Sequence, residues 1–90
     1  MNARRVDRIR TLLEVAFEPE LLDVEDDSHK HAGHAGAKDG LGHFNVSIVS
    51  EKFNGVRMLA RHRAVYAALD DMMKTDIHAL AIDAVASDEL

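Results

Sequence analysis

Three of the chain's six histidines, His29, His31 and His34, lie close together in a run that also contains a glycine. An imidazole side chain ligates metal ions, changes charge near neutral pH, or forms hydrogen bonds inside a core. Core packing explains three imidazoles poorly in such a stretch. The His-x-His-x-x-His spacing is compatible with metal ligation, and the alternative is a set of solvated loop histidines.

The chain contains no cysteine. Any iron–sulfur or soft-metal chemistry would therefore need a partner protein to supply the sulfur ligands. The absence of cysteine also excludes a disulfide framework.

The size and charge of the chain narrow the function classes. Ninety residues, of which 47% are hydrophobic, indicate a single domain spanning residues 1–90. So small a domain favours a binding or scaffold module over an enzyme, and no Gly-x-Ser-x-Gly, P-loop or dinucleotide motif is present. The net charge of −5 opposes non-specific nucleic-acid binding. Without a signal segment or a bilayer-spanning apolar run, we expect a soluble, cytoplasmic protein with no membrane partner.

Hydrophobic periodicity predicts the elements that position these histidines. Apolar residues at three- and four-residue steps predict a helix over 3–17, which Pro19 ends. Alternation predicts strands over 21–26 and 43–50. Between them, residues 28–42 hold four of the five glycines and show no periodicity, so we expect a flexible His- and Gly-rich loop joining a β-hairpin.

The Asn54-Gly55 pair predicts a turn, after which the second helix and the third strand of the domain follow. A helix follows over 56–73, and then a strand over 77–84, in which His78 would share a face with Leu80 and Ile82. Residues 85–90 allow a final helical turn. The apolar stripe of the long helix is expected at Leu59, His62, Val65, Tyr66, Leu69, Met72 and Met73. The order α-β-β-α-β, with an optional last helix, predicts an α+β fold with helices on one face of a three-stranded sheet.

Several sequence blocks resemble the BolA family, in the same order, over roughly residues 5–89. The most distinctive are the Phe-x-Gly turn, the Arg-His-Arg-x-Val-Tyr block and the His-Ala-Leu block. The full set is Phe17-Glu18-Pro19, Leu22-Asp23-Val24, Asp27-Ser28, His31, Gly33-His34, Gly42-His43-Phe44, Val49 to Gly55, Arg61 to Tyr66, and Ile77 to Leu80.

The resemblance implies a class II KH-like fold and a partnership with monothiol glutaredoxins that carry a Cys-Gly-Phe-Ser motif. In such heterodimers a [2Fe–2S] cluster bridges the two proteins. The glutaredoxin cysteine and glutathione supply sulfur, and the BolA protein supplies histidine or cysteine. The isolated chain is then expected to be a monomer without a cofactor.

The resemblance also assigns the cluster ligands. His78 matches the ligand in the family's His-Ala-Leu block, whereas the residues alone favour a partly buried histidine there. His31 matches the position of the second ligand, with His34 and then His29 as substitutes. His43 is expected on the strand surface, and His62 in packing.

A DNA-binding regulator is the alternative function, since the family has also been associated with transcriptional regulation. Arg61 and Arg63 are expected to point outward from the long helix and to form a basic patch with Lys52 and Arg57. The expected surface for a partner protein or for nucleic acid consists of Lys52, Gly55, Arg57, Arg61, His62 and Arg63. The patch adjoins the turn at Gly55, but a Gly-x-x-Gly loop for clamping a nucleic-acid strand is missing. An enzyme is the third class, and a glycine-rich loop gives its catalytic groups little fixed geometry.

Overall fold

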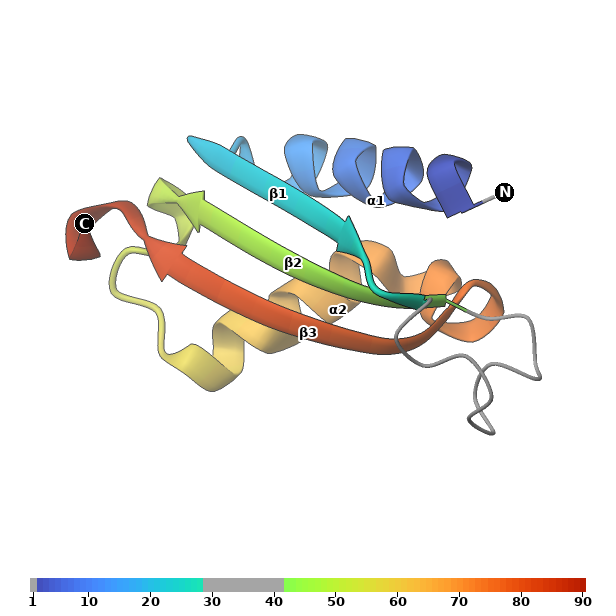
Figure 1. Cartoon of the computed structure of the whole chain (residues 1–90). Helices are drawn as coiled ribbons and strands as arrows, with labels where there is room; N and C mark the ends of the chain where they lie inside the picture. Colours follow the sequence, from blue (N-terminus) through green and yellow to red (C-terminus); the bar gives the residue numbers. More distant parts are fainter. Residues whose placement is uncertain (1, 29–41) are drawn as a thin grey trace.

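The computed structural model describes residues 2–28 and 42–90 (Figure 1). All of the predicted helices and strands are present, with small shifts at their ends. In chain order they are α1 (Asn2–Phe17), β1 (Leu21–Asp26), β2 (Gly42–Ser50), the 3-10 turn η3 (Glu51–Phe53), α2 (Met58–Thr75), β3 (Ile77–Ala86) and the 3-10 turn η4 (Ser87–Glu89). The predicted loop 28–42 lies outside the described residues except for its two ends.

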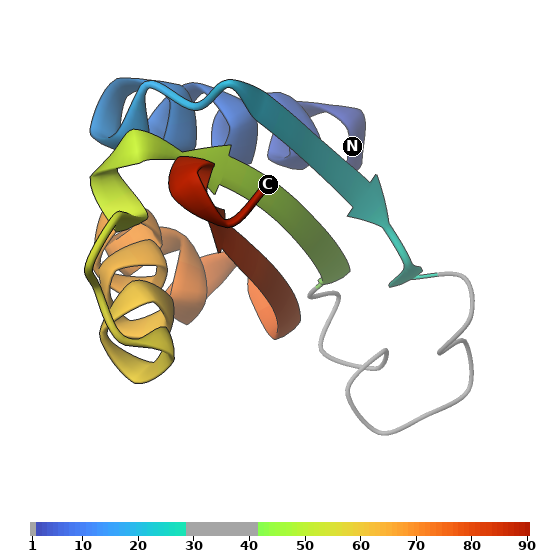
Figure 2. The same ribbon diagram turned by 90° about the vertical axis from the view of Figure 1, so that its left-hand side faces the viewer.

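The three strands form one mixed sheet in the order β1-β2-β3. The β1–β2 pair is antiparallel, with Val24 opposite Val46. The β2–β3 pair is parallel, with Val46 opposite Ile82, so the chain must cross over between these strands, and α2 makes the crossover. Both helices cover the same face of the sheet (Figures 1 and 2). This confirms the predicted α+β arrangement, while the KH-like label stays an implication of the resemblance.

The core lies between the sheet and the two helices. Side chains at helical spacing on α1 and α2 pack against every second side chain of β2. The side chains of β2 point alternately to the two faces of the sheet, as in any strand. The most deeply buried are Ile9, Leu13, Phe44, Val46, Ile48, Phe53, Val65, Leu69, Met72, Ile77, Ala84 and Ala86.

The apolar stripe predicted for α2 is wrong at two positions. Leu59 is 62% exposed and Tyr66 is 40% exposed, whereas Val65 and Leu69 are buried as predicted. Arg61, rather than Leu59, occupies the first inward position of the helix and lies one helical turn before Val65. The inward-facing side of α2 therefore begins with a charged residue, Arg61.

The prediction that Arg61 points outward is also wrong, because Arg61 is only 5% exposed. Its Nε donates to the Val56 carbonyl at 2.8 Å, and its Nη1 donates to the Ala84 carbonyl at 3.1 Å. Two further bonds, of 2.7 and 2.9 Å, reach the carboxylate of Glu89. Glu89 also accepts a hydrogen bond from the Ala86 N–H at 2.8 Å. The guanidinium therefore joins the start of α2 to the end of β3 and to η4.

A buried serine joins the end of α1 to the end of β2. Ser50 is fully buried, and its Oγ donates to the Phe17 carbonyl at 2.6 Å and accepts from the Lys52 N–H at 3.1 Å. Helix α1 stops there because Glu18 adopts a left-handed conformation (φ 45°) before Pro19. The same hydroxyl thus satisfies a carbonyl at a helix end and an N–H at the start of η3.

We predict that Ser50→Ala lowers the free energy of unfolding by about 1–3 kcal/mol, because it leaves a buried carbonyl without its donor. Ser47→Ala is the matched control, since Ser47 lies on the same strand and is exposed; it should change the free energy by less than about 0.5 kcal/mol. Urea unfolding followed by circular dichroism measures both. Equal losses in the two variants would contradict the role given to Ser50.

The Arg61–Glu89 pair also predicts a pH dependence of stability. Hydrogen bonds from Arg61 lower the pKa of Glu89 from its ordinary 4.5 to about 2. The folded state therefore holds the carboxylate form more strongly than the unfolded state does. The stabilisation of the folded state by the ionised Glu89 is fully present above the ordinary pKa. It is lost as the pH falls from about 4.5 toward about 2.

We expect Glu89→Gln to be less stable than the parent protein at pH 7, with the difference shrinking between pH 5 and pH 2. Asp88→Asn removes one negative charge from the neighbouring exposed residue and should change stability less at pH 7. Unfolding midpoints in urea across this pH range measure the effect. A difference in unfolding midpoint between Glu89→Gln and the parent protein that stays constant from pH 5 to pH 2 would refute the role given to the Glu89 carboxylate.

Candidate functional site

Two histidines from different strands lie side by side at one end of the sheet. His43 is at the start of β2 and His78 is at the start of β3, and their ring centroids are 5.1 Å apart with the rings tilted by 51°. The parallel pairing of the two strands produces this contact, because it places both strand starts at the same end. His78 is exposed and accessible to a partner, whereas His43 is only 7% exposed.

An irregularity in the sheet determines where His78 lies. Gly42 is opposite Ile77, but His43 is opposite Ala79, so His78 is an extra residue in β3. Such a bulge interrupts the alternation of side chains along the strand. Leu80 therefore packs against the core while His78 is exposed. The prediction that these two residues share a face is wrong for this reason.

The prediction that His43 lies on the strand surface is also wrong. Its backbone is held on the β1 side, where its N–H donates to Ser28 Oγ at 3.0 Å and its carbonyl accepts from the Asp27 N–H at 2.7 Å. The His78 ring lies against it on the β3 side. The His43 side chain is therefore buried, with the His78 ring beside it. The sequence signal that points to it is its position directly after the glycine-rich segment.

The two ends of the predicted loop are both anchored close to this histidine pair. At one end, the Ser28 N–H donates to Asp26 Oδ1 at 2.9 Å. At the other, the Gly42 N–H donates to the Asp76 carbonyl at 2.9 Å. A β-carbon at Gly42 would lie 2.4 Å from the Phe44 ring, so a larger residue does not fit. The predicted ligands His29, His31 and His34 lie outside the described residues.

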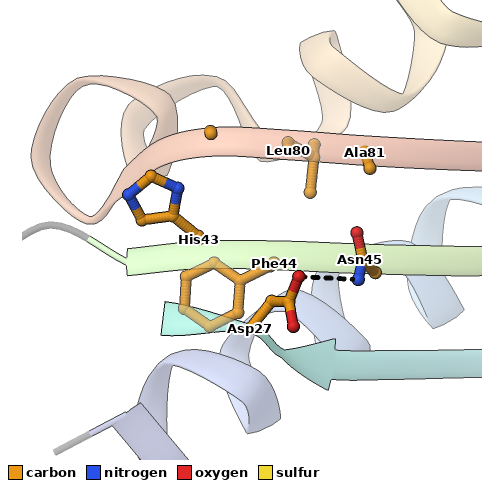
Figure 3. Close-up of a pocket in the computed structure, with 7 residues that line it drawn as sticks. Asp27, His43, Phe44, Asn45, Leu80 and Ala81 are labelled. Carbon is orange, nitrogen blue, oxygen red and sulfur yellow. Dashed lines mark hydrogen bonds between the residues drawn. The ribbon is translucent and has the colours of Figure 1, made fainter. Parts of the chain in front are cut away.

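A hollow of about 360 Å³ opens beside His43 (Figure 3). One polar contact within it joins Asn45 Nδ2 to Asp27 Oδ2 at 3.3 Å. The hollow lies along β2 and β3, and its lining residues are Asp27, His43, Phe44, Asn45, Ala79, Leu80 and Ala81. Alanines on β3 leave this part of the sheet open.

A charged residue holds the turn that leads into His78. Asp76 Oδ1 accepts from the Thr75 hydroxyl at 2.5 Å, and Asp76 Oδ2 accepts from Arg5 Nε at 3.1 Å. The hydrogen bond from the Thr75 hydroxyl lowers the pKa of Asp76 the most, and the hydrogen bond from Arg5 lowers it further. The backbone N–H of Asp76 donates to the Met72 carbonyl at 2.8 Å. The start of β3 is therefore tied to α1 as well as to the end of α2.

The histidine pair offers two imidazole rings at the end of the sheet where β2 and β3 start. Neutral imidazoles are good ligands for iron and zinc. In residues 2–28 and 42–90, no group of three or more histidine, cysteine, aspartate or glutamate side chains is placed to hold a metal ion. Since the whole chain has no cysteine, any thiolate at this site must come from another molecule.

The predicted basic patch lies at the other end of the sheet (Figure 1). Lys52, Arg57 and Arg63 are exposed, and His62 is half-buried. Gly55 adopts a φ of 74°, which suits glycine in the turn. The structure does not bring this patch together with His78, and it removes Arg61 from the patch.

Comparison with known proteins identifies the family. The family model described as BolA-like protein matches residues 13–89. The chain is 46% identical over 80 residues to SufE-like protein 1, chloroplastic/mitochondrial, and 47% identical over 81 residues to Protein BOLA1, chloroplastic, both of Arabidopsis thaliana. It is 42% identical over 76 residues to the DNA-binding transcriptional regulator BolA of Escherichia coli.

These matches cover 83%, 87% and 84% of this chain, but 22%, 51% and 70% of the three relatives. The chain thus spans about a fifth of the first and half of the second. Among solved structures, the BolA domain of SufE1 from Arabidopsis thaliana superimposes with a TM-score of 0.84 at 43% identity, covering 96% of this chain and 95% of that one. No helix in the described part of the chain is long and apolar enough to cross a membrane. Because two relatives carry organelle names, the cytoplasmic location stays a prediction.

Proposed function

This chain belongs to the BolA family, and on that premise we propose that it is a non-catalytic adaptor in iron–sulfur cluster assembly. It binds a monothiol glutaredoxin and shares a [2Fe–2S] cluster with it through histidine. The observation that carries the proposal is the exposed His78 at a strand bulge, in a chain without cysteine. Such a chain offers nitrogen ligands and needs its partner's sulfur.

His78 has the accessibility that a shared ligand needs. A cluster held between two proteins must meet ligands at the surface of each, and the His78 side chain is exposed. His43 is buried and packs beside the His78 ring, so it positions that ring rather than reaching the partner. Replacing thiolate by imidazole on one iron is known chemistry for [2Fe–2S] centres and raises their reduction potential.

His31 is the proposed second ligand, with His34 as the substitute. His31 follows the anchored Ser28 by three residues in the sequence. Ser28 itself bonds to the backbone of His43, which lies against His78. This closeness in sequence to the anchor beside His78 supports His31 as the residue that joins His78 on the same iron.

We predict that His78→Ala abolishes or strongly alters the cluster spectrum of the heterodimer with a Cys-Gly-Phe-Ser glutaredoxin. His62→Ala is the matched control, since it removes an imidazole from α2 without touching the histidine pair. Anaerobic co-expression, visible circular dichroism, and iron and sulfide per heterodimer are the measurements. An unaltered spectrum and metal content in His78→Ala would overturn the ligand assignment, and His31→Ala and His34→Ala identify the second ligand.

DNA binding is the second candidate, favoured by the name of the Escherichia coli relative and by the exposed Arg57 and Arg63. Arg61 contributes little to it, because its guanidinium is already bonded to Glu89. We expect no sequence-selective complex in a gel-shift titration at micromolar protein and moderate salt. A selective complex that Arg63→Ala weakens would favour this function instead.

A further inference from the structure

The outer edge of the sheet along β3 is only partly occupied. β3 is an outermost strand, and alternate residues of such a strand direct their N–H and C=O groups away from the sheet. Ala84 does so, since its carbonyl accepts from Arg61, and Ala86 does so, since its N–H donates to Glu89. By the same alternation, Leu80 and Ile82 also present their backbone groups outward.

The outward N–H and C=O groups of Leu80 and Ile82 neither donate nor accept a hydrogen bond within the part of the chain that the structure describes. On the opposite edge of the sheet, the Leu22 carbonyl accepts from Arg10 Nη1 at 3.3 Å, and Val24 also directs its backbone groups outward. Arg61 and Glu89 thus close the C-terminal half of the β3 edge and leave its first half open. That open half begins beside the exposed His78.

We propose that this open edge of β3 binds an extended segment of another protein, which adds to the sheet as a fourth strand. In such strand addition, main-chain hydrogen bonds supply affinity and alternate side chains supply selectivity. The amino-acid composition of the open β3 edge permits strand addition. Residues 79–82 contain neither proline nor lysine, which commonly protect exposed edges.

The charges beside the edge indicate the chemistry of the added strand. On the face away from the helices, Asp83 is opposite Ser47, which is opposite Asp23, and both aspartates are exposed. The small Ala79 and Ala81 leave room on this same face. On the helix side, Leu80 and Ile82 are half-buried and offer apolar contact. The fitting segment therefore alternates basic side chains with apolar ones.

A second copy of the chain fits this edge less well. Pairing two β3 strands would add two acidic faces to one sheet, and each chain carries a net charge of −5. A basic segment of a different protein meets complementary charge instead. The inference does not depend on the proposed cluster chemistry, and its test contains no metal.

The probe is a capped eight-residue peptide of alternating lysine and valine, with a glutamate–valine peptide as the charge control. Ile82→Pro removes one outward N–H, and Ile82→Ala is the matched variant that shortens the same side chain but keeps the N–H. Binding is followed by NMR titration. We expect the lysine peptide to bind the parent and Ile82→Ala, to bind Ile82→Pro at least about fivefold more weakly, and the glutamate peptide not to bind.

Amide hydrogen exchange on the parent protein gives a second readout that needs no variant to fold. The lysine peptide should slow exchange at Leu80 and Ile82 but not at Val24, whose amide points outward from the opposite edge. Absence of binding, equal binding to Ile82→Pro and Ile82→Ala, or equal protection of Val24 would overturn the proposal. A concentration-dependent dimer that Ile82→Pro abolishes would overturn it in favour of a second copy.

Discussion

The structure depends on the pairing of the central strand β2 with a neighbour on each side. β1 pairs with it in the antiparallel sense and β3 in the parallel sense. Every second side chain of β2 is buried against the helices, so a shift of one residue would turn Phe44, Val46 and Ile48 away from the core. The bulge at His78 lets β3 keep this register while one residue leaves the alternation.

The helices and strands could be predicted because their apolar residues repeat with the period of each element. The orientation of single polar side chains could not. Arg61 lies inward because carbonyls of Val56 and Ala84 and the Glu89 carboxylate surround it, and these groups come from three different segments. Periodicity carries no information about such distant partners, and it does not signal a bulge.

The two candidate functions occupy opposite ends of the molecule. The histidine pair and the anchored loop ends lie where β2 and β3 start, and the exposed arginines lie near the start of α2 (Figure 1). Variants at His78 and Arg63 therefore separate the two functions without perturbing a common site.

The parallel crossover has a consequence for how the site arises during synthesis. His43 and His78 are neighbours in space, yet the whole of α2 must be made between them. A nascent chain emerging from the ribosome exposes His43 and the loop well before β3 exists to complete the sheet. The histidine pair therefore forms only once the crossover has closed, so an unfinished chain does not contain the paired site.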